Sequence, residues 1–219
     1  LTPNIPMTGN NVSLDLMEFI EGKILPKYSE FDKAHNIEHV TKVIRSSMKL
    51  ARQLGTDINM SYAIAAYHDI GMSGPRALHH INGGKILQND MRLRKWFSPA
   101  QIKIMKEAIE DHRASASHEP RSIYGRIVAE ADRDISVDSI FRRTVQFGLE
   151  HYKEKSKEEH WERFLEHMMQ KYSINGYIKL WIPGSENEKK LNEIRSIIED
   201  TSLLRTYFDK FYEEETSSL

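Results

Sequence analysis

Residues 62–71, YAIAAYHDIG, form a nearly all-apolar stretch that ends in a histidine, an aspartate and a glycine. The apolar run predicts a short buried helix, with Ser61 as its cap and Gly71 as its stop. A carboxylate at the end of such a helix should not be buried unless it is paired or bound to a metal ion. His68 and Asp69 are therefore the strongest functional signal in the chain.

Apolar residues recur at helical spacing on both sides of this stretch, and no segment shows the sustained alternation that is typical of strands. The sequence therefore predicts an all-α protein, a compact multi-helix bundle. The pairing of Gly83 with Gly84 inside one expected helix suggests the close approach of a neighbouring element. The expected helices cover residues 13–25, 38–54, 62–70, 77–88, 98–112, 122–135, 138–151, 156–168 and 191–198, with a loop at 175–188.

The length of 219 residues fits one large domain with an appendage. We expect a flexible N-terminus over residues 1–12, a core over 13–140, and a helical C-terminal extension over 141–219 that packs on the core. The acidic end from Glu213 is expected to fray.

Composition excludes several classes of protein. The net charge of -1 gives no reason to expect nucleic acid or an anionic membrane as a partner. With no cysteine, any metal ion must be held by His, Asp and Glu. No apolar run approaches the roughly 20 residues that cross a bilayer, and the first residues do not resemble a secretion signal, so a cytoplasmic location is expected.

Three further polar residues fall on the apolar faces of expected helices. His39 lies on the core side of one helix, His112 continues the apolar stripe of a second, and Asp132 continues that of a third. Each residue alone is better explained as a hydrogen-bonded core histidine or an ion-paired aspartate. Together with His68 and Asp69 they describe a site at the mouth of a bundle, where helical folds build metal centres. Five further histidines lie among polar or mixed neighbours in the sequence and are expected at the surface: His79, His118, His151, His160 and His167.

In order along the chain, these residues form the pattern H…HD…D. Residues 35–40 (HNIEHV), 65–71 (AAYHDIG) and 131–133 (ADR) also match in their local contexts. Over about residues 30–140 the chain resembles the HD-domain superfamily of metal-dependent phosphohydrolases. The resemblance implies that one metal ion is held by His39, His68, Asp69 and Asp132.

Two further segments resemble HD proteins with a two-metal centre. These are residues 80–84 (HINGG) and 108–113 (AIEDHR). The similarity implies that Asp69 bridges to a second metal ion held by His80 and His112. In related proteins a lysine often follows in a His-Asp-x-Gly-Lys run, and this chain has Met72 there. The Gly-Tyr-Pro signature of cyclic-dinucleotide phosphodiesterases does not follow His112. Cyclic di-GMP is therefore a poor candidate substrate.

Such ligands suit Fe or Mn first, with Zn, Ni, Co or Mg as alternatives, at one or two divalent ions per chain. A divalent ion makes hydroxide available at neutral pH. The expected reaction is hydrolysis of a phosphate ester or anhydride, and the expected substrate is a nucleotide. Asp69 and His68 are the expected catalytic residues. The candidate substrate-binding residues are Arg76, Arg113 and Lys179.

Two alternative functions remain open, and so does the oligomeric state. Residues 35–39 (HNIEH) also fit H-x-x-E-H, an inverted zinc-protease motif, in which His35 would be a ligand and Glu38 the base. A catalytically weak HD module could instead bind a nucleotide as a regulatory signal. A homodimer is a further expectation.

Overall fold

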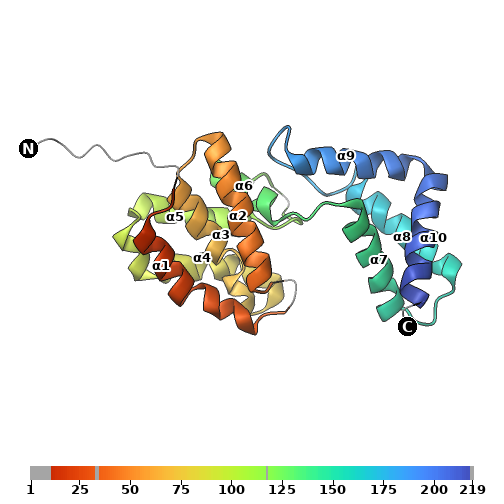
Figure 1. Ribbon diagram of the computed structural model, residues 1–219, viewed down its shortest axis with the longest axis horizontal. Coiled ribbons are helices and arrows are strands. Elements are labelled where there is room, and N and C mark those ends of the chain that lie inside the picture. The colour runs from red at the N-terminus through yellow and green to blue at the C-terminus, as the bar shows by residue number, and fades with distance from the viewer. Residues whose placement is uncertain (1–10, 33–34, 117, 218–219) are drawn as a thin grey trace, which may run out of the picture. The chain divides into compact units, whose positions relative to one another are not determined.

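A computed structural model describes residues 11–32, 35–116 and 118–217, and within these ranges it contains helices and no strand (Figure 1). The prediction of an all-α protein is confirmed. The chain divides into two units after Asp132, whereas the sequence placed the end of the core at residue 140. Most of the expected flexible N-terminus lies outside the described residues. The packing of the C-terminal helices on the core stays a prediction. No described helix has both the length and the apolar character that spanning a membrane requires.

The N-terminal unit is built around a central helix, α3 (Ile58–Tyr67), in which every residue except Asn59 is buried. This helix packs against α2, α5 and α6, as its apolar sequence on all sides predicts. The other elements of the unit are α1 (Leu14–Lys23), α2 (Ile37–Leu54), α4 (His79–Asn89), α5 (Pro99–Asp111) and α6 (Ile123–Asp132), with short 3-10 helices at Leu25–Glu30, Ile70–Ser73, Arg76–Leu78 and Met91–Lys95.

Helix α3 differs from its prediction at both ends. It begins at Ile58 because the Asp57 carboxylate accepts the backbone N–H of Met60 at 3.0 Å, so Asp57 is the cap and Ser61 lies buried inside the helix. It ends at Tyr67, one residue before His68. His68 and Asp69 therefore occupy the turn between two helices, where their side chains can face a common centre.

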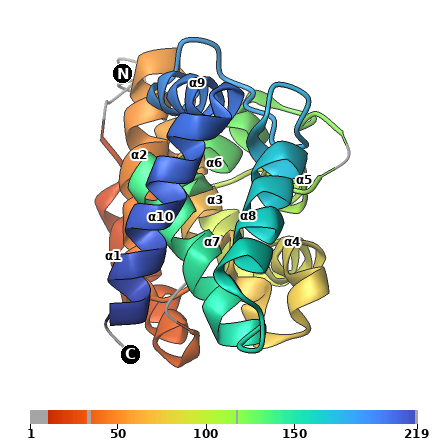
Figure 2. The same ribbon diagram turned by 90° about the vertical axis from the view of Figure 1, so that its right-hand side faces the viewer.

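The C-terminal unit contains α7 (Val137–His151), α8 (Lys157–Tyr172), α9 (Glu186–Glu199) and α10 (Thr201–Ser217), and α7 packs against α8 and α10 (Figure 2). The prediction of a fraying acidic tail from Glu213 is wrong, because α10 continues to Ser217. The Arg142 guanidinium pairs with Glu214 and with Glu215, each at 2.7 Å, and lies over the buried ring of Phe211. These ion pairs and the apolar face of α10 hold the acidic end in a helix.

Close approach of α4 to the turn after α3 depends on glycine. A Cβ atom at Gly71 would lie 1.9 Å from the backbone oxygen of His79 and 2.6 Å from the backbone nitrogen of Gly83. A Cβ at Gly83 would lie 3.1 Å from the Ile109 side chain and 3.3 Å from the His68 carbonyl oxygen. The close approach expected at the two helical glycines is thus present: Gly83 lies against the turn that carries His68 and Asp69, and Gly84 lies against Lys106 and Glu110 of α5.

We expect Gly71→Ala to lower the free energy of unfolding by about 3 kcal/mol or more, because backbone atoms must move to admit the methyl group. Gly22→Ala is the control: apart from the backbone of α1 and the two chain neighbours, no described atom lies within 4 Å of a Cβ there, and the change should stabilise the protein by about 0.5 kcal/mol. Urea unfolding followed by circular dichroism measures both. A loss below about 1 kcal/mol for Gly71→Ala would contradict this account of the close approach.

Candidate metal centre

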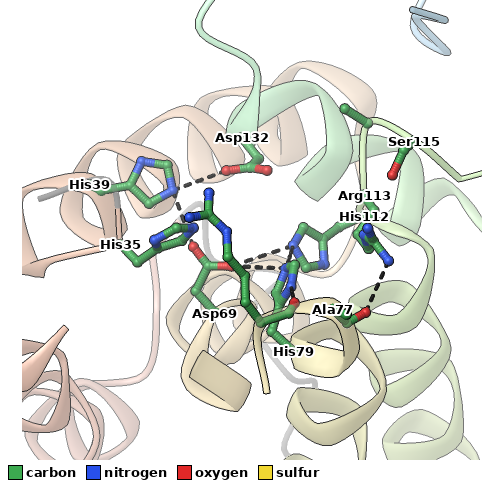
Figure 3. A pocket seen from close by; sticks show the side chains of 11 residues that line it. His35, His39, Asp69, Ala77, His79, His112, Arg113, Ser115 and Asp132 are labelled. Carbon is green, nitrogen blue, oxygen red and sulfur yellow. Dashed lines mark hydrogen bonds and ion pairs between the residues drawn. The ribbon is translucent and has the colours of Figure 1, made fainter. Parts of the chain in front are cut away.

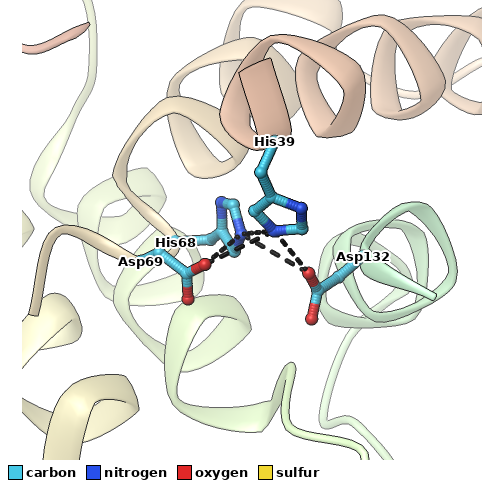
Figure 4. A group of neighbouring side chains, drawn as sticks. All are labelled: His39, His68, Asp69 and Asp132. Carbon is cyan, nitrogen blue, oxygen red and sulfur yellow. Dashed lines mark hydrogen bonds and ion pairs between the residues drawn. The ribbon is translucent and has the colours of Figure 1, made fainter. Parts of the chain in front are cut away.

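Four side chains from three helix ends meet in a first group, which consists of His39, His68, Asp69 and Asp132 (Figure 4). The His39 Nε2 atom lies 3.0 Å from Asp132 Oδ1 and 3.4 Å from His68 Nε2. The Asp69 Oδ2 atom lies 3.1 Å from His68 Nε2 and 3.4 Å from His39 Nε2. The four residues that the H…HD…D pattern singled out are therefore neighbours in space.

Local structure places each member of this group. The Asn36 side chain accepts the backbone N–H of His39 at 3.0 Å, which starts α2 and leaves His39 in its first turn. Asp132 is the last residue of α6. The carbonyl of Ala66, close to the end of α3, accepts a hydrogen bond at 2.7 Å from the buried hydroxyl of Tyr28. Tyr28, which the sequence did not single out, thereby supports the turn that carries two of the four side chains.

A second group shares Asp69 with the first and adds His79 and His112 (Figure 3). The Asp69 Oδ1 atom lies 3.5 Å from the Nε2 atom of each of these histidines. The two histidine Nε2 atoms are 3.4 Å apart. One oxygen of Asp69 thus faces the first group and the other oxygen faces the second, as a carboxylate that bridges two cations would.

Three of the histidines have the same hydrogen bond on the far side of the ring. The Nδ1 atoms of His68, His79 and His112 lie 2.7, 2.8 and 2.6 Å from the carbonyl oxygens of the residues three positions earlier. A carbonyl can only accept, so each Nδ1 carries the proton, and a neutral ring then presents a lone pair at Nε2. This second hydrogen bond is the one that metal-binding histidines usually make.

The spacing of the facing atoms fits a cation between them. Two neutral imidazoles whose Nε2 lone pairs face each other at 3.4 Å, as in His79 and His112, repel each other unless a cation lies between them. Metal–nitrogen and metal–oxygen bonds of about 2.0–2.2 Å place neighbouring ligand atoms about 3.0–3.5 Å apart. The facing atoms named above are 3.0–3.5 Å apart. Both groups are therefore able to hold a divalent metal ion.

The charges of the first group also call for a cation. Burial opposes a positive charge on His39, but hydrogen bonds to Asp132 and Asp69 outweigh it and raise the pKa of His39 to about 9. Burial would raise the pKa of Asp69, yet the neighbouring histidines, His68 foremost, hold that pKa well below its usual range. Without a metal ion, protons on the histidines supply the positive charge that the two carboxylates attract.

The second group corrects one expectation about the histidines. The structure brings His79, rather than His80, to Asp69 and His112, and the expected surface position of His79 is wrong because its side chain is only 13% exposed. Successive residues of a helix point about 100° apart, so only one of two adjacent histidines can face Asp69. The Nδ1 atom of His80 is instead buried with no hydrogen-bond partner among the described residues, and burial lowers the pKa of His80 to about 4.

A cavity of about 500 Å³ opens over both groups, and its walls belong to the N-terminal unit. Arg76 and Arg113, the two arginines singled out in the sequence, line it, and the Arg113 Nη1 atom donates to the carbonyl of Ala77 at 3.1 Å. Lys179 is exposed in the C-terminal unit and is not among the lining residues, so its part in substrate binding stays a prediction.

An ion pair between the buried Asp111 carboxylate and the half-exposed Arg121 supports the segment that carries Arg113. The Asp111 carboxylate, 2% exposed, accepts the backbone N–H of Arg121 at 2.8 Å and the Arg121 guanidinium at 2.8 Å. Charge-assisted bonds of this kind are strong and directional. They tie the segment just before α6 to the end of α5, next to His112. Nothing in the spacing of the sequence pointed to this pair.

The zinc-protease interpretation of residues 35–39 finds no support in this geometry. His35 lines the cavity, but its Nδ1 atom lies 2.7 Å from Asp32 Oδ1, and His35 belongs to neither group of potential ligands in the described chain. Glu38, which would be the base, is exposed and is not among the lining residues. The potential ligands come from helices far apart in the sequence instead.

The comparison with protein-family models agrees with the pattern of residues. Residues 36–135 match the family model of the HD domain. A search of curated proteins found no match. Among solved structures, the chain is similar to the crystal structure of a predicted HD superfamily hydrolase from an uncultured Thermotogales bacterium, with 18% identity over 92% of this chain and 91% of that chain and a TM-score of 0.48.

The matched segment contains the four residues of the first group and the two histidines of the second. It begins at the cap of α2 and ends just past α6, so it covers the helices whose ends build the centre. Residues 36–135 are thus identified as an HD domain, as the pattern of residues predicted.

Proposed function

We propose that this protein is a metal-dependent phosphohydrolase that cleaves a phosphate ester or anhydride of a small molecule. A nucleotide is the first candidate substrate. The observation that carries the proposal is the division of the Asp69 carboxylate, whose Oδ2 atom faces His39 and His68 while its Oδ1 atom faces His79 and His112. A shared carboxylate of this kind suits a two-metal site.

In this proposal the first group of side chains holds one divalent ion and the second group holds another. Mixed nitrogen and carboxylate donors favour Fe or Mn, with Zn, Ni or Co next, over Mg, which prefers oxygen ligands and water. Ions in such a pair activate water at neutral pH and stabilise the attacking and leaving oxygens of a phosphoryl displacement.

The protein's own side chains would bind and orient the substrate. Arg76 and Arg113 stand on the wall of the cavity, where their guanidinium groups can pair with phosphate oxygens and with the charge that develops on them. Asp69 as the acceptor of a proton from the attacking water stays a prediction, and its lowered pKa makes it a weak base. His68 is completely buried and gives Nδ1 to the carbonyl of Ala65, so its contribution is to hold the ion rather than to move a proton.

The size of the cavity supports a small substrate. A volume of about 500 Å³ falls in the range of sites that take small molecules and cofactors. A nucleotide would place its phosphate between the arginines and the metal groups. A homodimer stays a prediction.

The test is hydrolysis by purified protein loaded with Mn or Fe. The substrates are model phosphodiesters and a panel of nucleotides, and the control is Asp69→Ala. Faster turnover by the wild type than by the control supports the proposal, and equal rates on every compound contradict it. Tight nucleotide binding in the presence of metal without any turnover would favour the regulatory module instead.

Arg113→Gln should lower kcat/KM for the best substrate about 10- to 100-fold, because a charge-assisted contact to phosphate is lost. Arg76→Gln should act in the same direction. Metal content should not change, since neither arginine belongs to the two groups. The control is Arg94→Gln, an exposed arginine outside the cavity, which should behave as wild type. An unchanged kcat/KM in both cavity variants would exclude the arginines from substrate binding.

A further inference from the structure

The C-terminal unit contains a cavity of its own, of about 510 Å³, close in size to the one over the metal centre. It lies among α7, the segment that joins α7 to α8, α8 itself and α10. Its lining residues all belong to this unit and include Leu149, Lys153, Lys155, His160 and Tyr212. None of these residues takes part in the proposed hydrolysis.

Cations around this cavity lack carboxylate partners within the described chain. No ion pair is found for Lys153, Lys155 or Arg163, and Lys155 lies 5.9 Å from the centre of the Tyr152 ring. Arg163, just behind the wall, donates to the carbonyl of Thr144, but its Nε atom is buried without a partner. Lys155 and Arg163 are partly withdrawn from water without a counter-ion, which costs free energy, while Lys153 stays exposed, so the cluster favours an anion.

His160 is a second unsatisfied group at the same place. Its expected surface position is wrong, because the residue is only 3% exposed, and its Nδ1 atom has no hydrogen-bond partner among the described residues. Gly148 allows the approach: a Cβ there would lie 3.0 Å from His160 Nδ1 and 2.6 Å from Arg163 Nη2. Burial, followed by the charges of Arg163 and Lys155, lowers the pKa of His160.

The carboxylates nearby do not neutralise these cations. Glu215 lines the cavity, but it is bound by Arg142 at 2.7 Å and by the Gln146 amide at 3.0 Å. Glu159 accepts the backbone N–H of Ser156 at 2.7 Å and caps α8. Glu150 also lines the cavity, but Glu150 and Glu154 are exposed to solvent, as Lys153 is, and screening weakens their attraction for the lysines. The positive charge of the two lysines and Arg163 is therefore available to a ligand.

We infer that the cavity of the C-terminal unit binds the phosphate group of a small anionic molecule. Phosphate carries a charge of about −1.5 to −2 at neutral pH and three strong acceptor oxygens, which suits two compact ammonium groups and a buried imidazole. Leu149 and Tyr212 offer apolar contact to the remainder of a phosphorylated compound. This inference does not depend on the proposed hydrolysis.

Hydrogen–deuterium exchange of the full chain tests it, with inorganic phosphate and with adenosine monophosphate as separate probes. We expect protection of residues 146–160 and 212–215. Lys153→Gln combined with Lys155→Gln should raise the ligand concentration that gives half-maximal protection about tenfold or more. The control combines Lys189→Gln with Lys190→Gln on α9, outside the cavity, for the same change in charge, and it should leave the affinity unaltered.

The experiment is repeated in the Asp69→Ala variant, which weakens phosphate binding at the metal centre, so that protection of the C-terminal segments is measured with less binding elsewhere. Protection of the C-terminal segments that persists there supports the inference even if hydrolysis is never found. Stronger protection by the nucleotide identifies a phosphorylated compound, and equal protection identifies free phosphate. Protection confined to residues 68–79 and 112–115, or no protection, overturns the inference. Should the double variant fold poorly, His160→Gln must weaken binding in its place.

Discussion

We expect Asp69→Asn to lose metal from both groups at once. The substitution keeps the shape of the side chain but removes the negative charge that both groups share, and an amide is a weaker ligand than a carboxylate. The metal content should fall from about two ions per chain to below one, and any phosphohydrolase activity should fall on the order of a thousandfold.

Elemental analysis of protein purified without a His tag measures the first effect, and the nucleotide panel measures the second. Asp90→Asn is the matched control. Asp90 is a partly buried aspartate that accepts the Tyr67 hydroxyl at 2.7 Å and pairs with Arg92, outside both metal groups. It should keep its metal. Two ions per chain in Asp69→Asn would rule out the bridging carboxylate.

His79→Ala and His80→Ala should have opposite results although the two residues are adjacent. His79→Ala removes one of the three side chains of the second group, so we expect the loss of about one metal ion per chain and a fall in turnover of about a hundredfold. His80→Ala removes a ring that contacts neither group, so metal content should stay at the wild-type value.

Metal analysis of the two variants side by side decides between the two histidines. Circular dichroism confirms that each variant is folded. Retained metal in His79→Ala together with a loss in His80→Ala would restore the ligand that the resemblance implied, and it would contradict the geometry around Asp69. Equal and complete retention in both would reduce the second group to a hydrogen-bonded histidine cluster.

The helical class and the first metal group could be read from the sequence because both depend on local periodicity. An apolar run on all sides predicted that α3 is central, and polar residues at the core positions of other helices predicted which side chains meet. His39, Asp132 and His112 were found in this way, since a residue on an apolar stripe must face the core wherever the helix is placed.

The acidic C-terminal end was misjudged because its stabilising partners are distant in the sequence. Glu214 and Glu215 are held by Arg142 on α7, some seventy positions earlier. Local composition alone favoured a solvated tail. The buried His160 was missed for the same reason, since Gly148 on another helix makes room for it.

The sequence alone determined that the chain is helical and that His39, His68, Asp69, His112 and Asp132 share one centre, because hydrophobic periodicity assigns each side chain to a face. Only the tertiary structure decided between His79 and His80. That choice depends on the rotation of α4 against the turn after α3, which is set by the contacts of Gly71 and Gly83 with neighbouring backbone. Such packing between separate elements leaves no periodic signal in the sequence.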